Sequence, residues 1–114
     1  MSIKFKTNDP NKLLNSFKKA IDDGNIDTWS YDKDGDFTHT TSSGQWENKA
    51  WLRPKTRVGE LLFIILSPKN TTLTSEVYAV YHGRFVESML SHCDSLFSNA
   101  ETSALPADGD TISS

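Results

Sequence analysis

Residues 74–98 read TSEVYAVYHGRFVESMLSHCDSLFS and form the most regular amphipathic stretch of the chain. On a helical wheel with about 100° per residue, one side collects the apolar residues Tyr78, Tyr81, Phe85, Val86, Met89, Cys93 and Leu96. The opposite side collects Arg84, Glu87, Ser91, Asp94 and Ser98. Thr74 or Ser75 can cap the first turn, so the stretch predicts a long helix with one face in the core.

His82 lies near the centre of that apolar side. A titratable group directed at a core must be neutral or paired. Buried polar groups are usually satisfied by structural hydrogen bonds, which favours a core histidine. The alternative interpretation is that His82 belongs to a functional site.

A second helix is predicted near the start of the chain. Asp9 is a good N-cap residue and Pro10 suits the first helical position. Apolar residues then follow at helical spacing, and Gly24 suits a helix end. These signals predict a helix over residues 10–23.

Four strands are predicted between the helices, over residues 28–32, 37–41, 50–58 and 61–66. Asp34-Gly35 is a hairpin signal between the first two strands. Pro54 places the third strand at an edge or a bulge. The run LLFIIL over residues 61–66 is typical of a central strand buried on both faces.

The resulting order is α-β-β-β-β-α, and short connections favour antiparallel neighbours. We therefore expect an α+β fold with a four-stranded antiparallel sheet and two terminal helices packed on one face. Residues 1–98 form this single domain. Residues 99–114 are small, polar and acidic, so we expect a disordered tail.

The charge and cysteine content limit the classes of partner. The 114 residues carry a net charge of −3, and the acidic tail accounts for it, so the folded part has no basic field to attract nucleic acid. Cys93 is the only cysteine, which fits a reducing, cytoplasmic location. No signal peptide or long apolar run is evident, so we expect a soluble protein that does not enter a membrane.

The third predicted strand carries the clearest binding signal. Its alternation places Trp51, Arg53, Lys55 and Arg57 on one face. An aromatic residue among basic ones can form the centre of a protein interface or stack single-stranded nucleic acid. It can also be an ordinary solvated strand face.

A sheet covered by helices on one face would leave half of the central strand exposed on the other. Trp29 and Tyr31 from the first strand are available to line that face together with the third strand. Large apolar patches rarely stay open in soluble monomers. Either loops fold over the face, or a protein partner or a second copy in a homodimer covers it.

Metal and catalytic signals are weak. Asp32 to Asp36 resemble the opening of a calcium loop, but the glycine and glutamate of an EF-hand are not at their places. The histidines and Cys93 lack zinc-ligand spacing, so we expect no metal and no cofactor. A pocket between the second helix and the sheet could still gather His82, Tyr78, Tyr81 and His39.

The favoured interpretation is a small non-catalytic module that binds a protein or itself through the sheet face and the third strand. The main alternative is a small enzyme or ligand-binding domain that uses the pocket around His82, Tyr78 and His39. Binding of single-stranded nucleic acid is a weaker alternative.

Overall fold

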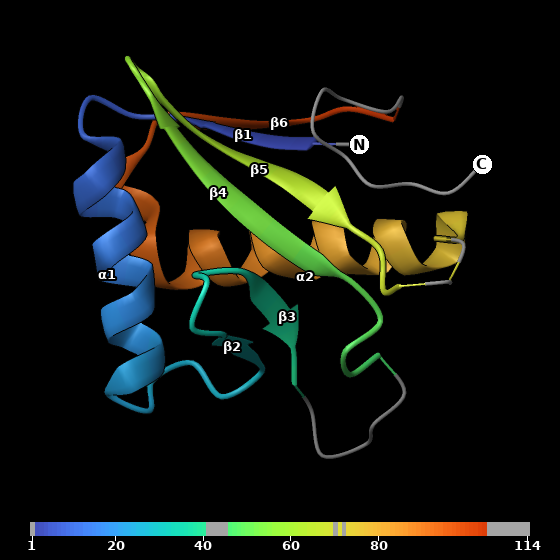
Figure 1. The fold of residues 1–114 in the computed structure, drawn as a ribbon. Coiled ribbons are helices and arrows are strands. Elements are labelled where there is room, and N and C mark those ends of the chain that lie inside the picture. The colour runs from blue at the N-terminus through green and yellow to red at the C-terminus, as the bar shows by residue number, and fades with distance from the viewer. Residues whose placement is uncertain (1, 41–45, 70, 72, 105–114) are drawn as a thin grey trace.

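The fold is an antiparallel sheet with two helices packed on one of its faces (Figure 1). It is seen in a computed structural model that describes residues 2–40, 46–69, 71 and 73–104. Its elements are β1 (Ser2–Lys6), α1 (Pro10–Asp22), β2 (Trp29–Tyr31), β3 (Phe37–His39), β4 (Trp51–Arg57), β5 (Glu60–Leu66), α2 (Ser75–Cys93), the 3-10 turn η1 (Asp94–Leu96) and β6 (Asn99–Thr102). The predicted α+β class, with both helices on one face, is confirmed. The helices are not terminal as predicted, because β1 precedes α1 and β6 follows α2.

The sheet has six strands in the order β2-β3-β4-β5-β1-β6, so the prediction of four strands is wrong. The prediction lacks strand β1, although its sequence, SIKFK, alternates polar and apolar residues as a strand does. Ile3 and Phe5 are fully buried. They stand opposite Phe63 and Leu61 of β5, so β1 completes the centre of the core.

Strand β6 corrects the predicted boundary of the disordered tail. Lys4 and Lys6 of β1 stand opposite Glu101 and Asn99 of β6, so residues 99–102 form an edge strand. The sequence NAET has no apolar alternation. Backbone pairing with β1, the packing of Ala100 against the core and a hydrogen bond from the Ser2 N–H to the Ser103 hydroxyl hold this strand in place. Residues 105–114 of the predicted tail lie outside the described residues.

Both helices begin where their capping residues predict. The Asp9 carboxylate accepts a hydrogen bond from the Lys12 backbone N–H at 3.0 Å, and the Thr74 hydroxyl accepts one from Val77 N–H at 3.2 Å. Helix α1 ends at Asp22, close to the prediction. Helix α2 ends at Cys93 rather than Ser98, because the chain tightens into η1 and then turns into β6.

Aromatic rings fill the space between the helices and the sheet. Phe85 of α2 is fully buried at the centre of this cluster. Its ring centroid lies between 4.6 and 6.2 Å from those of Phe63, Trp29, Phe17, Phe37 and Phe5. One residue therefore links both helices to four strands.

The central strand β5 is buried on both faces, as its apolar run predicts. Leu61, Phe63 and Ile65 face the helices and belong to the core cluster. Leu62 and Ile64 face the other way, and they are also buried, at 7% and 2% exposed. The side of the sheet away from the helices therefore has apolar side chains at its centre.

Candidate functional site

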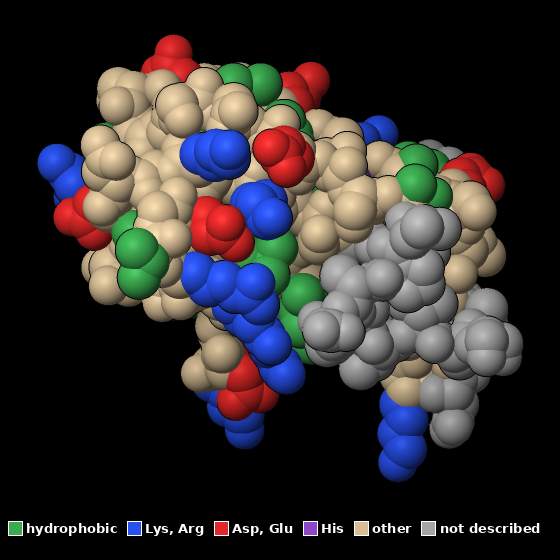
Figure 2. Space-filling model, turned by 90° about the horizontal axis from the view of Figure 1, so that it is seen from above, with side chains coloured by type: hydrophobic (Ala, Val, Ile, Leu, Met, Phe, Trp, Pro, Cys, Tyr) green, Lys and Arg blue, Asp and Glu red, His purple; other side chains and the backbone are tan. Residues whose placement is uncertain are grey.

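The candidate binding surface is the sheet face that points away from both helices, which we call the outer face. Strand alternation and register place on it Lys4, Lys6, Trp51, Arg53, Lys55, Arg57, Glu60, Leu62, Ile64 and Glu101. The four predicted binding residues of β4 are thus brought together on one face. Seen from above, Lys and Arg side chains run in a band with carboxylates beside them (Figure 2).

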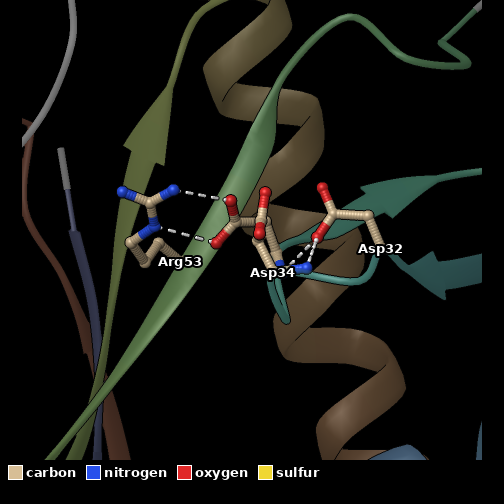
Figure 3. Close-up of polar contacts among 4 residues, drawn as sticks. Asp32, Asp34 and Arg53 are labelled. Carbon is tan, nitrogen blue, oxygen red and sulfur yellow. Dashed lines mark hydrogen bonds and ion pairs between the residues drawn. The ribbon is translucent and has the colours of Figure 1, made fainter.

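Arg53 is held by the turn between β2 and β3. Its Nε and Nη2 donate hydrogen bonds of 2.9 and 2.8 Å to the two carboxylate oxygens of Asp36, the residue that precedes β3 (Figure 3). Asp36 is only 4% exposed, and the fork geometry gives a charge-assisted pair. The hydrogen bond to Asp36 raises the pKa of Arg53, so this guanidinium is engaged within the fold.

The turn that presents Asp36 is itself fixed by a carboxylate. Asp32 Oδ1 accepts hydrogen bonds of 3.0 Å from the backbone N–H groups of Asp34 and Asp36 (Figure 3). Gly35 adopts φ +84, the left-handed conformation that favours glycine. The predicted Asp34-Gly35 hairpin turn is confirmed, and the carboxylates of Asp32 and Asp36 have a structural role.

The lysines of the outer face are not engaged in this way. Arg57 lies 3.9 Å from Glu60 in a loose ion pair. Within residues 2–40, 46–69, 71 and 73–104, Lys4, Lys6 and Lys55 form no ion pair. Lys4 and Lys55 stand on either side of Leu62 in one cross-strand row, about 10 Å apart at a spacing of about 4.8 Å per strand.

Trp29 and Tyr31 do not line the outer face, so this part of the prediction is wrong. Trp29 is 1% exposed and packs edge-on against Phe85 and Tyr81 in the core. Tyr31 faces α1, where its hydroxyl donates to the Asp22 carboxylate at 2.8 Å. The strand β2 was predicted correctly, but its aromatic side points to the helices.

The predicted pocket around His82 is divided by α2. Tyr78 and His82 line a groove of about 470 Å³ between α2 and β6. His82 is buried, and its Nδ1–H donates a 2.7 Å hydrogen bond to the Tyr78 carbonyl oxygen. The other two predicted members, Tyr81 and His39, do not line this groove.

Tyr81 is a structural residue rather than a pocket residue. It is fully buried, and its hydroxyl donates to the Trp46 carbonyl oxygen while accepting from the Lys49 N–H at 2.9 Å. These bonds tie the segment that precedes β4 to helix α2. The His39 ring lies 6.1 Å from the Tyr81 ring, on the side of α2 that carries Arg84.

His39 is 1% exposed, and its Nε2 lies 3.3 Å from Nη1 of Arg84. A guanidinium has only donors, so Nε2 accepts this hydrogen bond and the ring is neutral. Burial, and secondly the charge of Arg84, lower the pKa of His39 from the ordinary 6.5. The sequence placed His39 among the candidates, but it gave no signal for Arg84 as its partner.

The lowered pKa of His39 predicts acid sensitivity. The unfolded chain takes up a proton near pH 6.5, whereas the folded chain resists it, so stability is full above that pH and declines below it. Melting temperatures measured from pH 7.5 to about 4.5 should show this decline. His39→Gln should flatten the upper part of the curve, while His92→Gln, at an exposed position, should leave it unchanged. Equal curves for the wild type and His39→Gln would contradict the prediction.

The other chemical signals of the sequence do not assemble into a site. Burial, then the neighbouring Asp94, raises the pKa of the Cys93 thiol, which disfavours the nucleophilic thiolate. Among the described residues, no group of three or more His, Cys, Asp or Glu side chains is placed to hold a metal ion. In the same part of the chain, no helix is both long and apolar enough to cross a membrane.

The chain matches no protein family model, and neither the curated proteins nor the solved structures contain a significant match.

Proposed function

We propose that this protein is a non-catalytic binding module whose outer face docks an acidic segment of another protein. The observation that carries the proposal is the row of Lys4 and Lys55 on either side of buried Leu62, on a face that neither α1 nor α2 covers. Both lysines lack an ion-pair partner among the described residues. Carboxylates of a partner would supply the missing charges.

Charge complementarity selects an acidic partner. The face has five cations, Lys4, Lys6, Arg53, Lys55 and Arg57, with Asp36, Glu60 and Glu101 as carboxylates, whereas the whole chain has a net charge of −3. The outer face therefore carries a net positive charge although the protein as a whole is negative. Such a face attracts acidic partners and orients them as they approach. Half-buried Trp51 at the end of the same face adds an aromatic contact of the kind that dominates interfaces.

A protein fits this face better than a nucleic acid does. Glu60 and Glu101 lie within the same cross-strand rows as the lysines, where they would repel a phosphate backbone. Nucleic-acid binding depends on many uncompensated cations, and Arg53 and Arg57 are already paired. A polypeptide can place carboxylates at the two lysines and apolar groups elsewhere.

The test uses a displayed library of peptides in which Asp or Glu is fixed at alternate positions, selected on the full chain. We expect enriched peptides to lose binding by at least about tenfold to the Lys4→Glu/Lys55→Glu variant, because two attractive pairs become repulsive. The matched control is Lys12→Glu/Lys33→Glu, which changes the charge equally at exposed positions of α1 and the β2–β3 turn. Arg53 is left unchanged because it supports the fold.

Two outcomes would contradict this proposal. Peptides that bind both double variants equally would show that net charge, not the outer face, captures them. Tighter binding of a single-stranded oligonucleotide, with a steep loss on adding salt, would assign the face to nucleic acid. Light scattering of the free protein adds a third readout, since a dimer that Lys4→Glu/Lys55→Glu dissociates would make the occupant a second copy.

A further inference from the structure

A second feature lies apart from the outer face, beside helix α2. A depression of about 340 Å³ is lined by Thr28, Trp29, His39, Arg84, Glu87 and Ser88. Depressions of this size hold small ligands or parts of larger ones. Its walls come from β2 and the residue before it, from β3 and from one exposed turn of α2.

His39 contributes a hydrogen-bond donor that has no acceptor. Because Nε2 of this neutral ring accepts from Arg84, the proton of the ring sits on Nδ1. Nδ1 is buried and has no hydrogen-bond partner among the residues that the structure describes. A buried N–H without an acceptor is uncommon in folded proteins.

Trp29 contributes a second donor of the same kind. Its Nε1–H is also buried, with no acceptor in the described part of the chain, and an indole nitrogen can only donate. The Trp29 and His39 rings touch edge to face with centroids 5.1 Å apart. Two unsatisfied donors therefore belong to adjoining side chains in the wall of one depression.

Arg84 adds a cation to these two donors. In the part of the chain that the structure describes, its guanidinium forms no ion pair, and its one hydrogen bond goes to a neutral ring. The site thus has three kinds of donor, one of them charged, and Glu87 as the carboxylate in the lining. Such a set is complementary to an anion that accepts several hydrogen bonds.

We propose that the depression at Trp29, His39 and Arg84 binds the oxyanion group, carboxylate or phosphate, of a small molecule. The positive charge of Arg84 would attract the oxyanion, and hydrogen bonds from the two ring N–H groups would orient it. The two ring nitrogens are sealed from solvent in the present arrangement. Arg84 is exposed, so a rotation of its side chain away from His39 would open the way to them for an anion. This inference is independent of the outer face, which shares no residue with the site.

The experiment follows the three indole N–H signals of the ¹⁵N-labelled full chain by NMR. Acetate and inorganic phosphate are added separately, with sodium chloride keeping the ionic strength constant. We expect a saturable shift of the Trp29 signal, while the signals of Trp46 and Trp51 act as internal controls. Acetate acting more strongly would identify a carboxylate ligand, and phosphate acting more strongly would identify a phosphate ester.

Two variants locate the anion. Arg84→Gln should weaken binding by roughly tenfold or more, because a charge-assisted hydrogen bond is lost, whereas Arg57→Gln on the outer face should not. Glu87→Gln should tighten binding, because it removes a neighbouring negative charge. No saturable Trp29 shift with either anion, equal shifts of all three indoles, or unchanged affinity in Arg84→Gln would overturn the proposal.

Discussion

Phe85→Ala should lower the free energy of unfolding by about 3–5 kcal/mol, the range for truncating a buried aromatic residue. Phe85 is fully buried and contacts rings from α1, β1, β2, β3 and β5. A cavity at this position would remove contacts from both layers at once. Urea denaturation followed by circular dichroism measures the change.

The same helix offers a matched control. Leu90 is 51% exposed, so Leu90→Ala should change the free energy of unfolding by no more than about 0.5 kcal/mol. Similar losses at Phe85 and Leu90 would contradict the assignment of the buried face of α2. The comparison thus tests the predicted helical wheel and the aromatic cluster together.

Arg53→Ala should lower the free energy of unfolding by about 2–3 kcal/mol, because it leaves the buried Asp36 carboxylate without its cation. This estimate lies below the range for a fully buried pair, since the Arg53 side chain is 47% exposed and that of Asp36 is 6% exposed. Urea denaturation at pH 7 measures the loss. Lys55→Ala, two positions along the same strand, should change stability by no more than about 0.5 kcal/mol.

A double variant separates the charge from the shape of the pair. Asp36→Asn removes the charge with little change in volume, so Arg53→Ala/Asp36→Asn should be more stable than Arg53→Ala alone. Equal losses for Arg53→Ala and Lys55→Ala would mean that the ion pair contributes nothing to stability. In that case Arg53 would be free to bind a partner protein without loss of stability.

The periodic parts of the fold were predictable from local sequence. Both helices have capping residues and apolar spacing, and the run from Leu61 to Leu66 forms the central strand. Strand β1 also carried its signal in Ile3 and Phe5. Strand β6 carried none, because its sequence lacks apolar alternation and its place depends on pairing with β1, which lies far away in the sequence.

The sites were predictable only where the residues share one strand. Alternation alone places Trp51, Arg53, Lys55 and Arg57 on a common face. It does not reveal that Arg53 meets Asp36 or that His39 meets Arg84, since these pairs join residues from different elements. The core position of Trp29 was not predictable either, because tertiary packing decides which side of a strand faces a helix.

The position of β1 in the sheet has a consequence for folding kinetics. Ser2 stands opposite Ile64, and Ile3 stands opposite Thr102. Strand β1 therefore pairs with strands that are synthesised much later. Such long-range pairings raise the contact order and slow the search for the native state. During synthesis, Ile3 and Phe5 stay without their partners until β5 has left the ribosome, a period in which holdase chaperones would protect the nascent chain from aggregation.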